Sequence, residues 1–297
     1  DGLDSAKLSA RFAKALDDAG DTGGTSLAKE GDAAGAFAGA AKKLEAEYKV
    51  PFVAHAAMEP INCTAWVHDG KCEIWTSTQV PLMARSAVAK ALEISNDDVT
   101  VNQLYLGGAF GRRLESDYPV QAARVAKATG YPIKMIWSRE EDTRQDFYRP
   151  ADTSRFWGGL DGSGKPVSWN NAFTQLNGPD GSWDVSHYDV PNRSIRHAPA
   201  DMHLRFGSLR SVDHSQQGFF VESFIDELAH AAGQDPFDYR RKLLGKSPRH
   251  KAVLEKVAKM AGWGSALPPG SGRGIALVKS FGTIVAEVAE VKMQDGR

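Results

Sequence analysis

The chain has 297 residues, of which 42% are hydrophobic and 25% charged, as in globular proteins and unlike disordered chains. Its 36 basic and 37 acidic side chains give a formal net charge of -1, which excludes attraction of nucleic acid or anionic membranes through bulk charge. No apolar run approaches the roughly 20 residues of a membrane-spanning helix. We therefore expect no nucleic-acid partner, no membrane span, and about two domains or one large one.

The N-terminal region is predicted to be helical and peripheral. Apolar residues recur at helical spacing over 3–18 and again over 33–47, where Asp32 provides a cap. The stretch 18–32 between them is rich in glycine and aspartate and is predicted to be a surface linker. Residues 1–48 are accordingly expected to form a peripheral helical arm and linker.

Residues 49–150 are predicted to form a first α+β subdomain with the order β-β-α-β-α-β. Pro81 suits the first turn of one helix, and Gly130 suits the end of the other. The expected elements are a hairpin at 64–78, a helix at 80–94, a strand at 97–106, a helix at 117–130 and a strand at 131–138.

Residues 151–297 are predicted to form a second α+β subdomain with a helical segment. Neither terminus resembles a natural chain end, so we expect a fragment whose second subdomain is truncated at the C-terminus. The expected elements are a hairpin at 153–175, helices at 218–233, 236–244 and 250–263, and strands at 272–280 and 283–293.

The two cysteines, Cys63 and Cys72, are predicted to be buried and unpaired. If Asp69 and Gly70 form a hairpin turn, Val67 faces Cys72 and the two sulfurs lie roughly 13 Å apart. A disulfide cannot span that distance. The sequence has no CxxC or HExxH pattern, so neither thiol is expected to bind zinc.

The stretch LYLGGAFGRR, residues 104–113, is the first candidate for a binding site. It lacks the GK[ST] of a phosphate-binding loop and the GxGxxG spacing of a dinucleotide fold. Its glycines allow positive φ and close approach to backbone N–H groups, while Phe110 supplies an apolar wall. Arg112 and Arg113 add planar donors. The alternative is a structural turn that needs glycine for packing.

Polar residues elsewhere in the chain strengthen the binding interpretation. Gln79 falls at a predicted strand-to-helix junction, where its amide can be aimed at a ligand. Arg210 and Gln216 fall just before the long predicted helix. Taken singly, Gln79 also fits a surface or capping residue, and Arg210 also fits a structural ion pair.

Seven ordered motifs between residue 49 and the end of the chain resemble those of the molybdenum-binding large subunit of the xanthine dehydrogenase and aldehyde oxidase family, in its bacterial isoquinoline 1-oxidoreductase branch. The resemblance implies the N-terminal half of the α+β molybdenum cofactor-binding domain of that family. The motifs are VAHAAMEPINCTAWV, EIWTSTQVP, LGGAFGRR, WSREEDTRQDFYRP, YDVPN, LRSVDHSQQGFFVESFIDELAHAAGQDPFDYRRKLL and GRGIALVKSFGTIVAEVAEV.

The resemblance also implies a cofactor and roles around it. The family binds molybdenum through a pterin dithiolene, which in bacterial members carries a cytosine dinucleotide. By resemblance Gln79 donates to the apical oxo ligand, the backbone at Phe110 and Gly111 lines the metal's other side, and Arg210 adds a main-chain contact. The implied cofactor-binding set is Gln79, Gly108, Ala109, Phe110, Gly111, Arg112, Arg210 and Gln216.

The reaction implied by the family is hydroxylation of an electron-poor carbon with water as the oxygen source. Electrons leave through [2Fe–2S] clusters on a small partner subunit, and a cytochrome is a further candidate acceptor. The catalytic base of the family is a glutamate in a Gly-Glu pair, which this sequence lacks. We expect the second half of the large subunit to supply it, and we expect Glu59 and Glu222 to be structural.

Departures from the family motifs bear on the substrate. Purine-hydroxylating members carry a substrate-binding glutamate where this chain has Leu114, and their second substrate arginine falls near Gly178 and Pro179 here. The implied substrate is therefore an apolar N-heteroaromatic compound or an aldehyde, in a pocket lined by Phe110 and Leu114.

Three questions stay open from the sequence. Arg112 and Arg113 fit either contact with the pterin and its phosphates or a structural salt bridge to Glu115 or Asp117. A non-catalytic cofactor-binding or scaffold module is the alternative to an enzyme fragment. Relatives in this bacterial branch often carry a twin-arginine signal, which favours the periplasm over the cytoplasm.

Overall fold

The computed structural model describes residues 4–20, 23–176, 181–200 and 202–294, and its chain divides into two compact units. Unit 1 comprises Asp1–Pro51, Ala151–Met202 and Asp213–Arg297. Unit 2 comprises Phe52–Pro150 and His203–Val212. The sequence predicted three consecutive regions, whereas residues 1–51 fall in the same unit as most of the C-terminal part.

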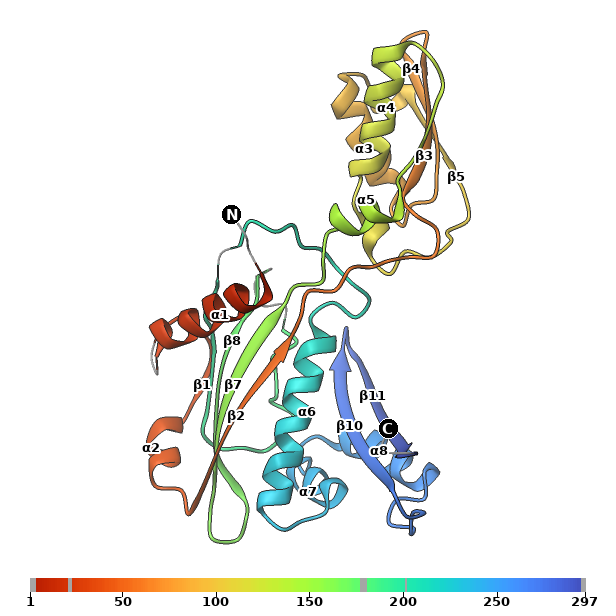
Figure 1. Cartoon of the computed structure of the whole chain (residues 1–297). Coiled ribbons are helices and arrows are strands. Elements are labelled where there is room, and N and C mark those ends of the chain that lie inside the picture. The colour runs from red at the N-terminus through yellow and green to blue at the C-terminus, as the bar shows by residue number, and fades with distance from the viewer. Residues whose placement is uncertain (1–3, 21–22, 177–180, 201, 295–297) are drawn as a thin grey trace. The chain divides into compact units, whose positions relative to one another are not determined.

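Unit 2 has the predicted β-β-α-β-α-β order, and this prediction is confirmed. Its four-stranded sheet has the order β5-β4-β3-β6, and α3 and α4 lie together on one of its faces (Figure 1). The elements are β3 (Asn62–His68), β4 (Lys71–Thr76), α3 (Pro81–Leu92), the 3-10 turn η1 (Asn96–Asp98), β5 (Val99–Gln103), the 3-10 turn η2 (Arg112–Leu114), α4 (Asp117–Thr129), β6 (Ile133–Ile136) and α5 (Arg139–Arg144).

Local signals account for most of these boundaries. Asp69 and Gly70 have φ of 46° and 75°, as a tight hairpin turn requires, and they set the pairing of Val67 with Cys72. Both cysteines are free and buried, as predicted, and burial raises the pKa of the Cys63 thiol to about 12. The sequence analysis missed α5, which begins where the Ser138 side chain accepts from the Glu141 N–H.

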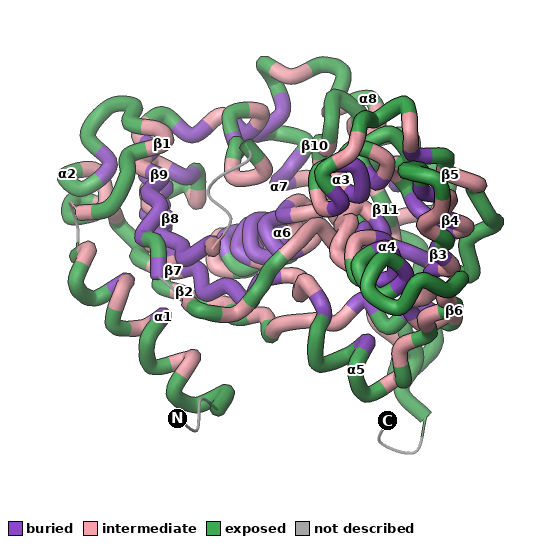
Figure 2. The backbone as a smooth tube through the Cα atoms, turned by 90° about the horizontal axis from the view of Figure 1, so that it is seen from above, coloured by how far each residue is buried: buried purple, intermediate pink, exposed green. Residues whose placement is uncertain are grey.

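Unit 1 is built on a five-stranded sheet of order β1-β9-β8-β7-β2, in which only β8 and β9 run parallel. The long helix α6 (His214–Ala231) is buried along much of its length beside β7 and β8 (Figure 2). The other elements are α1 (Ser5–Ala19), β1 (Thr25–Glu30), α2 (Ala33–Ala38), β2 (Lys42–Val50), β7 (Asp152–Leu160), β8 (Pro166–Thr174), β9 (Arg193–His197), α7 (Pro236–Leu243), α8 (Pro248–Met260), β10 (Ser271–Ser280) and β11 (Thr283–Lys292).

Two adjacent glycines of β7 show how the layers of unit 1 approach one another. A Cβ on Gly158 would lie 2.8 Å from side-chain atoms of Phe224 and Leu228 in α6, and one on Gly159 would lie 2.8 Å from the Ala40 Cβ that follows α2. Successive strand residues point to opposite faces, so α6 covers one face of the sheet and α2 the other. The two glycines allow both helices to pack closely.

The N-terminal prediction is only partly correct. Helix α1 is confirmed, with Phe12 and Leu16 buried, and Asp32 caps α2 as expected. The predicted helix over 33–47 is wrong beyond Ala38, because Lys42–Val50 forms the edge strand β2 and pairs with β7.

The predicted linker at 18–32 is likewise corrected, since Thr25–Glu30 forms strand β1 of the same sheet. The region 1–48 is therefore not a peripheral arm. Strand β9 was also missed, whereas the hairpin of β7 and β8, the three later helices and the pair β10 and β11 match the predictions. None of the helices that the structure describes is long and apolar enough to cross a membrane.

Candidate functional site

The glycine loop follows β5 in unit 2 and has an unusual backbone. Strand β5 ends at Gln103 rather than at the predicted residue 106, and the chain continues without regular structure to η2. Gly108, Phe110 and Gly111 have φ of 103°, 56° and 115°. For Phe110, which carries a Cβ, this left-handed conformation is strained and has to be held by its surroundings.

Two of the glycines are required by packing within unit 2. A Cβ on Gly107 would lie 2.5 Å from the Glu59 Cβ, and a Cβ on Gly111 would lie 1.5 Å from the Ser208 carbonyl oxygen. Gly108 is less crowded, since its nearest neighbour would be the Ala57 Cβ at 3.3 Å. The alternative interpretation, a structural turn that needs glycine for packing, therefore accounts for Gly107 and Gly111.

The loop nevertheless leaves a set of hydrogen-bond donors free. The Gly111 N–H donates to Gln79 Oε1 at 3.1 Å, which orients the exposed amide of Gln79. Within the described ranges, Gln79 Nε2 and the backbone N–H groups of Gly108, Ala109 and Phe110 have no hydrogen-bond partner. Neutral donors thus gather beside the half-exposed Phe110 ring, where they can hold anionic or oxo ligands.

Arg112 is held inside unit 2. Its side chain forms a bidentate pair with Asp117, both N···O distances being 2.9 Å, and its Nε lies 3.1 Å from Asp146 Oδ1. The guanidinium also stacks near the rings of Trp137 and Phe147 and is 2% exposed. The salt bridge from Arg112 to Asp117 is confirmed, which favours the structural alternative for this residue.

Arg113 is also buried, and it binds the loop to Glu59. Its Nη2 lies 3.1 Å from Glu59 Oε2, and its other donors reach the carbonyls of Gly108 and Ser77. Glu59 in turn accepts from the Gly107 N–H at 2.8 Å and from Asn62 at 2.8 Å. Burial raises the pKa of Glu59, but these hydrogen bonds and the Arg113 charge outweigh burial and lower it. Glu59 is structural, as expected.

Arg210 lies next to the loop, whereas Gln216 does not belong to it. The Arg210 N–H donates to the Phe110 carbonyl at 2.7 Å, and its exposed guanidinium lies 5.7 Å from the Phe110 ring. Gln216 is a buried residue of unit 1 inside the first turn of α6, not before that helix as predicted. Its Nε2 donates to Asp213 Oδ1 at 2.9 Å.

The other predicted residues have clear positions. Leu114 ends η2 and is partly buried, and its N–H donates to the Gly111 carbonyl. Gly178 and Pro179 lie outside the described residues. Glu222 is buried in unit 1, where it pairs with Arg240 at 3.0 Å. Burial raises the pKa of Glu222, although the Arg240 charge opposes it.

Two residues next to the loop, His55 and Asp146, were not predicted from the sequence. His55 is 7% exposed, and its Nδ1 lies 3.0 Å from Asp146 Oδ1 while its Nε2 lies 3.1 Å from the Ser208 carbonyl oxygen. Both residues occur within motifs that carry the family resemblance, VAHAAMEP and RQDFYRP, but neither motif indicates the pairing.

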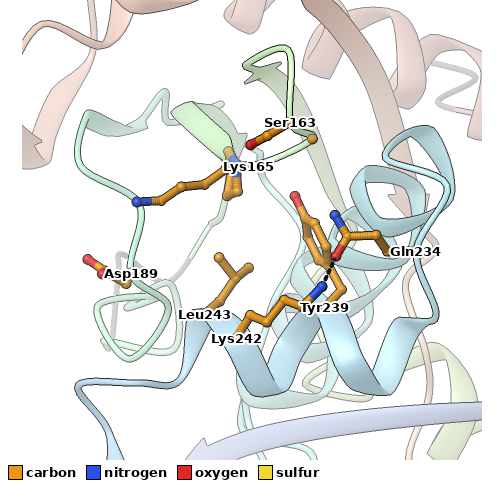
Figure 3. Close-up of a pocket in the computed structure, with 9 residues that line it drawn as sticks. Ser163, Lys165, Asp189, Gln234, Tyr239, Lys242 and Leu243 are labelled. Carbon is orange, nitrogen blue, oxygen red and sulfur yellow. Dashed lines mark hydrogen bonds between the residues drawn. The ribbon is translucent and has the colours of Figure 1, made fainter.

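Two observations bear on other kinds of site. In the described part of the chain, no group of three or more His, Cys, Asp or Glu side chains could hold a metal ion. Unit 1 has a separate pocket of about 280 Å³, where Lys242 donates to Gln234 at 2.6 Å (Figure 3). That pocket contains none of the predicted site residues. Its lining residues are Ser163, Gly164, Lys165, Pro166, Asp189, Gln234, Tyr239, Lys242 and Leu243.

Comparison with known proteins agrees with the motifs. The sequence model of the molybdopterin cofactor-binding domain matches residues 19–244. The beta subunit of isoquinoline 1-oxidoreductase from Brevundimonas diminuta is 32% identical over 238 residues, which cover 73% of this chain and 30% of that protein. The molybdenum-binding subunit PaoC of the Escherichia coli aldehyde oxidoreductase is 32% identical over 222 residues, or 71% of this chain and 30% of that protein.

The fold has a close counterpart among solved structures. Quinoline 2-oxidoreductase from Pseudomonas putida 86 aligns with a TM-score of 0.74 at 20% identity, over 86% of this chain and 38% of that one. The resemblance to the xanthine dehydrogenase and aldehyde oxidase large subunits, and the fold class inferred from it, are confirmed. The chain spans about a third of the length of these relatives.

Proposed function

This chain belongs to the molybdopterin cofactor-binding domain family, and on that premise we propose that its glycine loop forms one wall of a molybdenum site in the large subunit of a hydroxylase. The complete enzyme oxidises an aldehyde or an N-heteroaromatic compound, with water as the oxygen source. The rest of the large subunit completes the site.

The donors of the loop fit this cofactor. Gln79 has its amide oxygen engaged by the Gly111 N–H, so its Nε2 is the atom left to donate. Neutral N–H donors bind oxo and dithiolene ligands without displacing them from a metal, and they tune the metal from outside its coordination sphere. The free Nε2 of Gln79, beside the unpaired N–H groups of Gly108, Ala109 and Phe110, is the observation that carries the proposal.

The residues then have distinct roles. Gln79 would donate to an oxo ligand of the bound group, and the backbone at Phe110 and Gly111 would line the site. Arg210 acts through its backbone, because its N–H fixes the Phe110 carbonyl at 2.7 Å. Arg112 and Gln216 support the structure from within their own units, since their donors are engaged by Asp117 and Asp213.

When bound, the molybdenum–pterin group supplies the two-electron oxidation chemistry of the site. The loop of this chain would bind and orient the group, and neither Glu59 nor Glu222 is free to act as a general base. The Glu59 carboxylate is engaged by the Gly107 N–H and Arg113, and the Glu222 carboxylate by Arg240 and Tyr188. We assign the base to the rest of the large subunit.

The cofactor form and the partners follow the family. We propose the cytosine dinucleotide form of the pterin, a small subunit with [2Fe–2S] clusters and a cytochrome as the further acceptor, with the periplasm as the compartment. The relatives named as a beta subunit and as a molybdenum-binding subunit support an assembly of several chains.

The walls of the loop favour an apolar substrate. The Phe110 ring is 45% exposed, and the aliphatic Leu114 follows it at the end of η2. Neither side chain offers a donor or acceptor to the polar edges of a purine. Relatives named for isoquinoline and aldehyde support the same two substrate classes.

The test is to express the complete large subunit with its partner chains and to measure molybdenum and releasable cytidine nucleotide, followed by assays on isoquinoline and aromatic aldehydes. Molybdenum, cytidine nucleotide and turnover together support the proposal. A well-folded assembly that contains neither metal nor nucleotide contradicts it and favours the alternative, a non-catalytic scaffold module.

A further inference from the structure

In unit 2, His55 connects two segments next to the glycine loop, one that contains Asp146 and one that contains Ser208. Its ring lies between the Asp146 carboxylate, 3.0 Å from Nδ1, and the Ser208 carbonyl oxygen, 3.1 Å from Nε2. The backbone N–H of His55 also donates to Asp146 Oδ2 at 2.6 Å. His55 therefore links Ser208, in the segment 203–212, to the buried Asp146 carboxylate in the segment 52–150.

Both oxygen atoms that face the ring accept hydrogen bonds and do not donate. A carbonyl has no proton, and both oxygen atoms of Asp146 accept from backbone N–H groups, those of His55 and Phe147, while the Arg112 guanidinium lies beside them, as expected for a carboxylate. A neutral imidazole carries one N–H and would leave one of the two contacts without a proton. A ring with protons on both nitrogens makes both hydrogen bonds.

The segment that His55 holds lies directly against the loop. The Ser208 carbonyl oxygen packs against Gly111: a Cβ on Gly111 would lie only 1.5 Å from it. Two residues later, the Arg210 N–H donates to the Phe110 carbonyl at 2.7 Å. A shift of Ser208 would thus be transmitted to both residues that line the proposed metal site.

Both acidic and basic side chains surround His55. Arg112 lies on the same carboxylate, with its Nε 3.1 Å from Asp146 Oδ1, and also pairs with Asp117 at 2.9 Å. Arg112 and a His55 ring with protons on both nitrogens would face two carboxylates, Asp146 and Asp117. The nearby Glu115 adds a further acidic group that interacts with His55. A positive charge on His55 is compensated in this cluster.

We propose that His55, protonated on both ring nitrogens, is a positioning residue that fastens Ser208 to Asp146 and thereby holds Phe110 and Gly111 in their left-handed conformation. Within this loop the Gly111 N–H also orients the Gln79 amide. The consequence for the metal site rests on the function proposed above, whereas the link between Asp146 and Ser208 does not.

Two variants of the assembled enzyme separate the two hydrogen bonds. His55→Asn places an amide near the position of Nδ1, so it keeps the contact to Asp146 and loses the one to Ser208. His55→Gln reaches the position of Nε2 and keeps a donor for Ser208. His68→Gln, a histidine of β3 away from the loop, is the matched control.

Hydrogen exchange of the peptide 203–212 reports the link without any cofactor. Leaving a buried acceptor unpaired is expected to speed exchange roughly 5- to 150-fold in His55→Asn. His55→Gln is expected to fall between this variant and the native protein, and His68→Gln to match the native protein. Native exchange rates in His55→Asn would overturn the proposal.

Two further measurements test the charge and the role in positioning. Nitrogen NMR of histidine-labelled protein should show protons on both ring nitrogens of His55, and a ring with one bare nitrogen would overturn the doubly protonated form. The Mo(V) electron paramagnetic resonance signal should shift in His55→Asn and recover in His55→Gln. If His55→Asn speeds hydrogen exchange of 203–212 but leaves the Mo(V) signal unchanged, His55 does not position the residues around the metal. Native protein without molybdenum refutes the proposed function but leaves the exchange result valid.

Discussion

Gln79 Oε1 lies 3.1 Å from the backbone nitrogen of Gly111, so the loop itself orients the side chain that faces it. A backbone N–H can only donate, which identifies the bonded side-chain atom as oxygen and the free one as nitrogen. One hydrogen bond therefore determines which chemistry Gln79 presents. The free end of this side chain offers a donor to a ligand at the loop.

Replacing Gln79 by glutamate separates orientation from donation. Gln79→Glu keeps an acceptor for the Gly111 N–H but removes the free donor and adds a negative charge, so we expect most molybdenum to be lost from the purified enzyme. The free energy of unfolding should change by less than about 0.5 kcal/mol, because the residue is exposed. Metal analysis and thermal unfolding measure the two effects. Gln121→Glu, on the exposed face of α4, is the control, and equal metal content in both variants would contradict the assignment.

Gly111 is expected to tolerate no side chain. In Gly111→Ala the new Cβ would lie 1.5 Å from the Ser208 oxygen at a φ of 115°, so the segment 203–212 has to move. We expect a loss of stability of at least about 2 kcal/mol, as for other strained backbone positions. Gly162→Ala provides the comparison, because that glycine has open space around its Cβ position. Chemical denaturation should separate the two variants, and similar midpoints would show that the loop can relax.

Arg112 is expected to act through stability. Arg112→Met removes one partner of a buried ion pair, leaves Asp117 uncompensated and takes one of two partners from Asp146, which typically costs about 3–5 kcal/mol. Arg85→Met breaks the exposed pair with Asp97 and should cost about 0–1 kcal/mol. Denaturation in the absence of cofactor measures both. If Arg112→Met unfolds like the native protein but fails to retain the pterin, Arg112 is a cofactor contact instead.

The free energy of unfolding should fall at acid pH because the Asp146 carboxylate becomes protonated. Its pKa is lower in the folded protein than in the unfolded chain, because hydrogen bonds from His55 and the Arg112 charge outweigh burial. This contribution is fully present above the unfolded value, near 3.9, and is lost as the pH falls through the lower folded value. Asp146→Asn should flatten the dependence of unfolding free energy on pH below about 5. An unchanged slope would show that other carboxyl groups dominate.

The sequence predicted unit 2 better than the start of unit 1 because the signals in unit 2 are local. The turn at Asp69 and Gly70 and the helix start at Pro81 depend only on neighbouring residues. Strand β2 has the sequence KKLEAEYKV, whose lysine, glutamate and alanine favour helix, and it becomes a strand by pairing with β7 about a hundred residues later. The alternation of apolar and charged residues from Leu44 to Val50 matches the alternating burial of the strand, but the helical spacing of other residues obscured this signal.

The candidate site divides in the same way. Gln79, Phe110 and Arg210 were found from motifs, and the structure brings all three together around the loop. His55 and Asp146 were missed because 91 residues separate them, and no local pattern predicts their contact. The role of Arg112 stayed open in the sequence, because a buried arginine and a ligand-binding one look alike until Asp117 and Asp146 are placed.

The most direct test of the central claim is a structure of the assembled, cofactor-loaded enzyme at a resolution that defines the ligands of the metal. The account predicts Gln79 Nε2 within hydrogen-bond distance of an oxo ligand, with the Phe110 and Gly111 backbone on the other side of the metal. A molybdenum–pterin group bound elsewhere, with Gln79 facing solvent, would contradict it.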